Sequence, residues 1–146
     1  MKKSKRLQPV VKVAESREQQ AARALGQAQS RQADAEQRLA ELQGYREDYI
    51  ARFHAAGARG MGAVRMEDYQ KFLHKLAMAI EQQKQVIAQA QQVVEEKRRL
   101  WHVSRSKKQM LGNVVSRYQA EEQRLADRKE QGELDERSQR NTRDNS

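Results

Sequence analysis

The sequence has no cysteine, a single proline and few aromatic residues, and each shortage excludes a class of structure. Without cysteine there is no disulfide framework and no thiolate metal site, which fits a reducing compartment. Aromatic residues at 5% of the chain leave little material for a compact core. No apolar run approaches the roughly 20 residues that a membrane-spanning helix needs. We therefore expect a soluble, cytoplasmic protein.

What the chain has in abundance is alanine, glutamine, glutamate, lysine and arginine, a composition typical of long helices and coiled coils. Its formal net charge is +9. Such a charge predicts attraction to acidic surfaces, whether nucleic acid, anionic lipid or an acidic protein, and does not choose among them.

The longest hydrophobic repeat lies between Met66 and Leu125, where apolar residues recur in alternating steps of three and four. A repeat of seven sustained this long indicates a helix with one apolar seam, supercoiled around a partner. The stretch contains no proline, and its only glycine is Gly112. We predict a single long helix over residues 66–131.

A second heptad pattern precedes it and predicts a helix over residues 9–55, with Pro9 in the first turn, where a missing N–H is tolerated. One seam column of this helix is rich in alanine, at Ala14, Ala21, Ala28 and Ala35. A column this narrow allows a partner helix to approach closely, but it buries too little surface for the helix to be stable alone.

Residues 56–65 contain Gly57, Gly60 and Gly62 and predict the turn between the helices, because each glycine costs a helix about 1 kcal/mol relative to alanine. The predicted fold class is therefore all-α: a long two-helix antiparallel coiled-coil hairpin. Its best register places Phe53 opposite Tyr69, Leu42 opposite Ile80, and Trp101 over the small Ala21.

The ends of the chain are polar. Residues 1–8 are predicted to form a basic arm, and residues 132–146 a polar, disordered tail. The register makes the second helix overhang the start of the first beyond about Val115. Tyr118 and Leu125 are expected to have no partner within the chain.

The seam leaves one apolar flank uncovered, because a two-stranded hairpin cannot bury a third column. The second helix contributes Phe72, Ala79, Val86, Val93, Leu100 and Val114, and the first helix adds Tyr45. Either a second copy of the chain covers this flank, forming a bundle, or a different protein docks there. In the second case Tyr45 and Phe72 are the aromatic anchors.

Several segments in a fixed order resemble the FliJ family, small soluble proteins of the bacterial flagellar type III export apparatus. The matching segments are LQGYREDY at 42–49, YQKFL at 69–73 continuing to AIEQ at 79–82, Trp101, and RKEQGELDE at 128–136. The resemblance implies a non-enzymatic antiparallel coiled coil, similar to part of a rotary ATPase stalk. Its partners would be the hexameric export ATPase, the cytoplasmic ring of the export gate and export chaperones. The protein would sit peripherally at the inner membrane through these partners.

Carried over by position, the gate-binding surface of the family falls on Leu42, Tyr45, Tyr49, Phe72, Leu76 and Ala79. Tyr45, Phe72 and Ala79 coincide with the uncovered flank. The other three lie on the predicted seam. Two neighbouring positions, Arg38 and Gln83, depart from the glutamine and histidine that the family pattern implies. The resemblance to a rotary stalk implies that the end of the hairpin that holds both termini binds the ATPase ring.

Positive charge concentrates toward that terminal end. The basic set consists of Lys97, Arg98, Arg99, Arg105, Lys107 and Lys108. The alternative function is therefore a basic coiled coil that self-associates or binds nucleic acid or another anionic surface. Against nucleic acid, the chain folds back on itself, unlike a basic zipper, and no aromatic stacking platform accompanies the charge.

Nothing in the sequence points to catalysis. His54, His74 and His102 are scattered, without the spacing of metal ligands. The turn glycines do not form a phosphate-binding loop, and a two-stranded coiled coil offers no pocket to perturb pKa values. We predict no catalytic residue, no metal and no cofactor.

Overall fold

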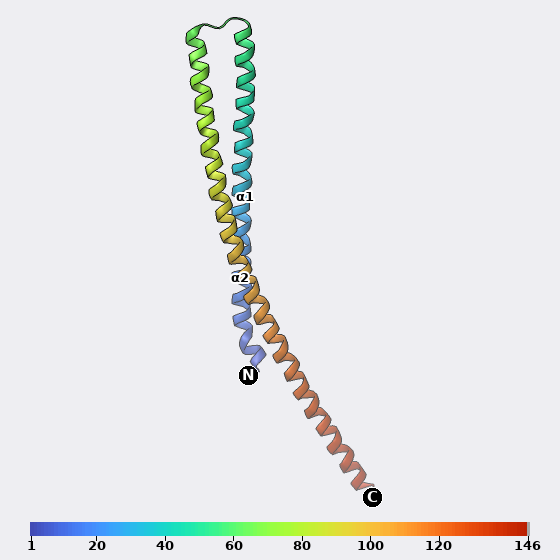
Figure 1. The fold of residues 1–146 in the computed structure, drawn as a ribbon. Coiled ribbons are helices and arrows are strands. Elements are labelled where there is room, and N and C mark those ends of the chain that lie inside the picture. The colour runs from blue at the N-terminus through green and yellow to red at the C-terminus, as the bar shows by residue number, and fades with distance from the viewer. Residues whose placement is uncertain (146) are drawn as a thin grey trace. The chain divides into compact units, whose positions relative to one another are not determined.

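Two helices account for nearly all of residues 1–145, the part of the chain that this computed structural model describes. Helix α1 spans Lys3–Ala58, and helix α2 spans Ala63–Asp144 (Figure 1). No strand occurs within these described residues. The all-α class and the helical hairpin predicted from the heptads are confirmed.

The turn is shorter than the ten residues suggested by the glycines, because Gly57 stays helical and only Arg59–Gly62 separates α1 from α2. Gly60 has a φ of 88°, in the left-handed region where a side chain would be strained. Its N–H donates a hydrogen bond to the Gly57 carbonyl at 3.1 Å, which ends α1. The Met66 N–H donates to the Gly62 carbonyl at 3.0 Å and starts α2.

Each helix passes through two compact units. The hairpin unit, Ala21–Trp101, contains the turn and the antiparallel helix segments on either side of it (Figure 1). Its core is a cluster of Leu42, Leu76 and Ile80, with Leu39, Tyr49 and Ala79 packed against it. Farther from the turn, the buried residues are Ala28, Ala35 and Val94. Leu42 and Ile80 therefore belong to one cluster that joins the two helices, which agrees with the register.

A polar residue on the seam of the hairpin unit is satisfied by the opposite backbone. The Gln83 side-chain amide donates a hydrogen bond to the Ala35 carbonyl at 3.0 Å. The small side chain of Ala35 leaves its backbone within reach of the amide. This bond explains how a glutamine can occupy a seam position at little cost, since a buried amide without a partner would be destabilising.

The terminal unit consists of Met1–Gln20 and His102–Ser146, of which all but Ser146 are described. Ala14 is buried in it, and the Lys108 ammonium lies 3.8 Å from the Glu18 carboxylate. Ser4 is buried against Glu122. The ends of both helices in this unit differ from the sequence-based expectation.

Helix α1 begins at Lys3, not at Pro9, so the segment expected to be a basic arm is helical. Contacts with α2 help to hold this first turn, because they involve Lys3 and Ser4. The Lys3 ammonium lies 5.5 Å from the centre of the Tyr118 ring. The prediction that Tyr118 has no partner within the chain is therefore wrong, and the unpaired part of α2 begins later than Val115. Leu125 is exposed.

Helix α2 continues to Asp144, through most of the segment 132–146 expected to be disordered; Ser146 lies outside the described residues. Polar side chains one turn apart support this end of α2. Gln123 donates to Asp127 at 3.0 Å, and Gln131 donates to Asp135 at 3.1 Å. Such pairs stabilise a helix that has no apolar face to bury.

Two glycine substitutions in the hairpin unit are expected to have opposite effects on its stability. Gly44 lies inside α1 with open space around its missing side chain, so Gly44→Ala should raise the free energy of unfolding by up to about 1 kcal/mol. Gly60→Ala should lower it by roughly 1–2 kcal/mol because of the positive φ. Circular dichroism at 222 nm during urea unfolding measures both. Shifts of the same sign would contradict the turn geometry.

Candidate functional site

The candidate site is an aromatic surface next to the turn of the hairpin unit. Steps of four residues bring Tyr45, Tyr49 and Phe53 to one side of α1, and a step of three brings Tyr69 and Phe72 to the facing side of α2. The ring centres of Tyr49 and Phe72 are 4.4 Å apart, those of Tyr49 and Tyr69 4.9 Å, and those of Phe53 and Tyr69 5.5 Å. These contacts span both helices, so the aromatic side chains hold one another in place.

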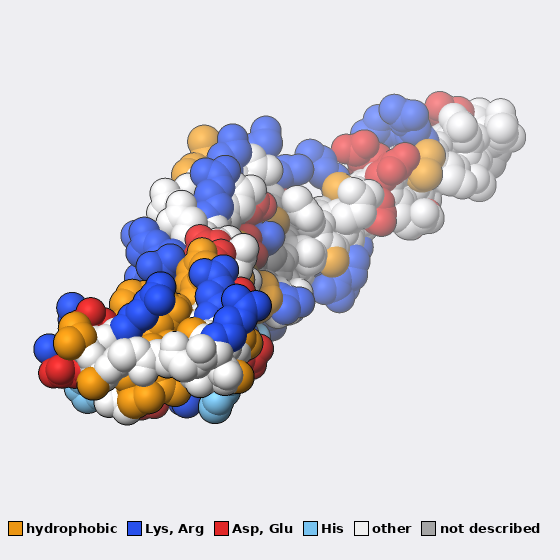
Figure 2. All heavy atoms as spheres, turned by 90° about the horizontal axis from the view of Figure 1, so that it is seen from above, with side chains coloured by type: hydrophobic (Ala, Val, Ile, Leu, Met, Phe, Trp, Pro, Cys, Tyr) orange, Lys and Arg blue, Asp and Glu red, His pale blue; other side chains and the backbone are white. Residues whose placement is uncertain are grey.

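A groove of about 410 Å³ opens beside these rings and is called the turn groove below. Its lining residues are Tyr45, Asp48, Tyr49, Arg52, Phe72 and Leu76. Figure 2 looks onto the turn end and shows hydrophobic side chains gathered there, with Lys and Arg side chains around them.

Exposure separates the residues that form the surface of the turn groove from those that form its floor. Tyr45 is 59% exposed and Phe72 43%, although both are large and apolar for most of their surface. Leu76, in the floor, is 9% exposed and belongs to the core cluster. Exposed aromatic side chains beside a buried apolar core are typical of surfaces that bind other proteins.

The edge of the turn groove carries one acid, Asp48, and one base, Arg52. Their charges offset each other, so attraction at this site comes mainly from apolar burial and from the directional polar groups of the two tyrosines. Binding there should depend weakly on salt.

The six gate-binding residues carried over from the family resemblance are only partly brought together. Four of them line the turn groove: Tyr45, Tyr49, Phe72 and Leu76. Leu42 is buried in the core cluster, and Ala79 is half-buried and packed against it. Ala79 is thus less accessible than its place on the uncovered flank suggested.

Asp48 and Arg52 line the groove but were not singled out in the sequence. The available signal was their spacing, since each follows a groove tyrosine by one turn of α1, Asp48 after Tyr45 and Arg52 after Tyr49. Helical neighbours three residues apart share a face. Charged residues at such spacing are common along any solvated helix, so the signal alone is weak.

The rest of the uncovered flank is apolar and accessible in the hairpin unit, where Val86, Val93 and Leu100 are exposed. In the terminal unit, Val114 is half-buried. A second groove in that unit is lined by Val10, Val13, Ala14, Arg17, Val103, Ser104, Lys107 and Leu111. Apolar surface is therefore present on both units.

The basic set is divided between the units. Lys97, Arg98 and Arg99 belong to the hairpin unit, whereas Arg105, Lys107 and Lys108 belong to the terminal unit. Arg98 lies 2.6 Å from Glu95 and Lys108 lies 3.8 Å from Glu18, so both form ion pairs. Arg99 and Lys107 are exposed.

The described residues contain no group of three or more potential metal-ligating side chains. Within residues 1–145, neither helix has a stretch long and apolar enough to cross a bilayer.

Substituting Tyr49, which packs against other rings, should affect stability more than substituting Tyr45, which is exposed. Tyr49→Ala removes two ring contacts and should lower the free energy of unfolding by roughly 1–3 kcal/mol. Tyr45→Ala removes an exposed ring and should change it by no more than about 0.5 kcal/mol. Urea unfolding followed by circular dichroism compares them, and equal losses would contradict the placement of Tyr45 on the surface.

Comparison with known proteins supports the resemblance seen in the segments. A protein-family model described as "Flagellar FliJ protein" matches residues 2–146. No curated protein and no solved structure shows a significant match to the chain.

Proposed function

This chain belongs to the FliJ family and is therefore a component of flagellar export, and we propose that it acts there as a non-enzymatic adaptor. In this proposal it links the export ATPase ring to the cytoplasmic part of the export gate and also interacts with export chaperones. It would reach the inner membrane only through these partners. The observation that carries the proposal is the exposed turn groove, which lies over the core cluster and is filled by none of the described residues.

The turn groove suits the export gate because its two most exposed residues are aromatic. Tyr45 and Phe72 together offer a large apolar area on side chains with few rotatable bonds, so ordering them on binding costs little entropy. Tyr49 packs between the two helices and holds Phe72 in position. We assign direct gate contact to Tyr45 and Phe72.

The remaining residues of the carried-over set would act through the shape of the groove. Leu42 and Leu76 are each 9% exposed and pack with Ile80. Ala79 packs against the same cluster. Substituting them would alter gate binding by loosening the floor beneath Phe72, with a loss of stability that the exposed aromatics would not show.

The ATPase ring is assigned to the basic set, where exposed positive charge remains available. Arg99 and Lys107 are exposed, in contrast to Lys108, whose ammonium lies close to Glu18. Exposed charges act over a distance that shortens as salt is added, about 10 Å at 0.1 M ionic strength. A charge-dependent partner and an aromatic-dependent partner can therefore be separated by salt.

Gate binding is tested by titrating the isolated cytoplasmic domain of the export gate against single variants. Phe72→Ala and Tyr45→Ala should each raise Kd by about 30-fold, the equivalent of a 2 kcal/mol interface anchor. Met78→Ala is the matched control, because Met78 is a large exposed apolar residue of the hairpin unit outside the turn groove. If Met78→Ala weakens binding as much as Phe72→Ala, the turn groove is not the docking site.

ATPase binding is tested with the charge reversals Arg99→Glu and Lys107→Glu across a salt series. Each should weaken binding of the export ATPase several-fold at low salt, with a smaller difference at high salt because of screening. Arg65→Glu reverses the same charge near the turn and should have little effect. Phe72→Ala should leave ATPase binding intact. Equal losses for Arg65→Glu and Lys107→Glu would overturn the assignment of the basic set.

A further inference from the structure

The first turn of α1 has no acidic side chain of its own to offset the positive end of the helix. A helix N-terminus carries unpaired N–H groups and a partial positive charge, which acidic side chains normally offset. The first turn of α1 contains no acidic residue. Instead, Lys2, Lys3, Lys5 and Arg6 surround it with positive charge. Alone, this segment would have a weak tendency to be helical.

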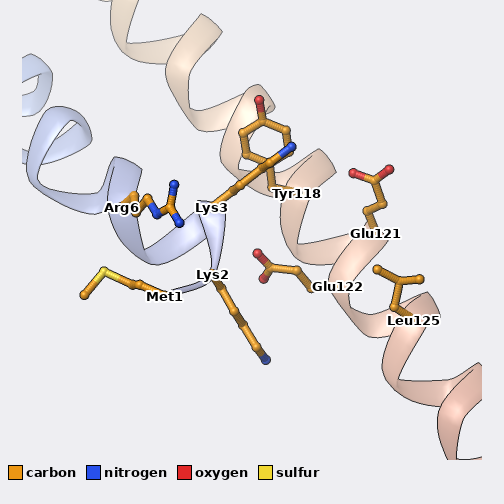
Figure 3. A pocket seen from close by; sticks show the side chains of 8 residues that line it. All are labelled: Met1, Lys2, Lys3, Arg6, Tyr118, Glu121, Glu122 and Leu125. Carbon is orange, nitrogen blue, oxygen red and sulfur yellow. The ribbon is translucent and has the colours of Figure 1, made fainter.

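The missing negative charge comes from Glu122 of α2. The Ser4 N–H donates a hydrogen bond to one carboxylate oxygen of Glu122 at 3.2 Å, and the Ser4 hydroxyl donates to the other at 2.8 Å. Ser4 is only 5% exposed. Figure 3 shows the Glu122 carboxylate between the two helices, whereas the neighbouring Glu121 points away from α1. Glu122 thus caps a helix to which it does not belong.

A second contact lies one turn earlier along α2. The Lys3 ammonium is 5.5 Å from the centre of the Tyr118 ring, a distance suited to a cation–π interaction. Lys3, Tyr118 and Glu122 are among the residues that line an open cleft of about 420 Å³. Both contacts join residues before Pro9 to α2.

Pro9 makes this first part of α1 separable from the rest. Proline has no N–H, so the Lys5 carbonyl lacks the hydrogen bond that would normally join the first turns to the helix that follows. Beyond Pro9, Ala14 is buried in the terminal unit. The residues after Pro9 are therefore anchored by apolar packing. Before Pro9, Leu7 is half-buried, and the contacts with Glu122 and Tyr118 join the segment to α2.

We propose that residues 1–8 form a strap that closes on α2 through the Glu122 carboxylate and opens about Pro9 when that carboxylate loses its charge. Closing covers the face of α2 that carries Tyr118 and Glu122. Opening exposes that face and releases Lys2, Lys3 and Arg6 from it. This device goes beyond the adaptor function and does not depend on it.

The hydrogen bonds and the charge around Glu122 determine how the closed strap responds to pH. The Ser4 hydroxyl bond is the main cause that lowers the pKa of Glu122; the Ser4 N–H bond and the charge of Lys2 act in the same direction, and burial opposes them. In the open strap the pKa returns to its ordinary value. The closed strap is therefore favoured above that ordinary value and is lost as the pH falls through the lowered one. Lys2, Lys3 and Arg6 from α1 and Tyr118 from α2 line the same cleft as Glu122, and Glu121 points away from α1.

The test uses the absence of cysteine in the native chain. Spin labels on a Lys5→Cys/Lys129→Cys background report the distance between the strap and α2 by double electron–electron resonance. At neutral pH the parent should give one narrow distance distribution. Glu122→Gln and Glu122→Ala should each reduce the narrow component, the alanine variant to a minor fraction. Acidification should do the same to the parent and change Glu122→Gln little.

Matched variants separate the strap from a general loss of structure. Glu121→Gln removes the same charge from the adjacent residue and should leave the narrow distribution intact. Ser4→Ala disrupts the contact from the side of the strap, without a change in α2, and should broaden the distribution. Pro9→Ala should move the acid transition to lower pH, because it restores the helical hydrogen bond to the Lys5 carbonyl. A narrow distribution in both Glu122→Ala and Ser4→Ala, or equal broadening in Glu121→Gln, would overturn the strap.

Discussion

The structure depends on a narrow apolar seam between two antiparallel helices, in which few side chains are buried. In the hairpin unit the largest contribution comes from Leu42, Leu76 and Ile80, and farther from the turn alanine on α1 allows the helices to approach. A core this thin cannot bury the other faces of either helix. Large apolar residues such as Tyr45 and Phe72 therefore remain at the surface, and the exposed turn groove is a direct consequence of the fold.

A thin core also places polar groups close to the seam, and the opposite helix satisfies them. The Gln83 side-chain amide donates a hydrogen bond to the Ala35 carbonyl, and the Ser4 hydroxyl donates one to the Glu122 carboxylate. Among the described residues, no buried side-chain polar atom lacks a hydrogen-bond partner. These bonds are directional, so they favour one alignment of the helices over a shifted one, which apolar contacts between similar heptads would distinguish poorly.

The FliJ family model matches residues 2–146, and the site that we propose for partner binding lies on a surface that the seam leaves open. Periodicity is shared by unrelated coiled coils, so the heptads alone indicate a hairpin and no partner. The order of the segments LQGYREDY and YQKFL is what distinguishes this chain. Both segments flank the turn and contribute Tyr45, Tyr49 and Phe72 to the turn groove.

The sequence by itself determined the helices, the turn and much of the seam, because heptad spacing and glycine act locally along the chain. It correctly paired Phe53 with Tyr69, and it placed Leu42 and Ile80, which share one core cluster, at the same level of the seam. Only the tertiary structure decided that α1 begins before Pro9 and that Tyr118 has a partner, since these depend on Lys3 and Ser4 meeting residues more than a hundred positions away. The tertiary structure likewise divided the candidate gate residues into an exposed pair, Tyr45 and Phe72, and four residues that are buried or half-buried. The exposure of a side chain depends on which residues of the opposite helix cover it, and the spacing of residues along one helix does not show this.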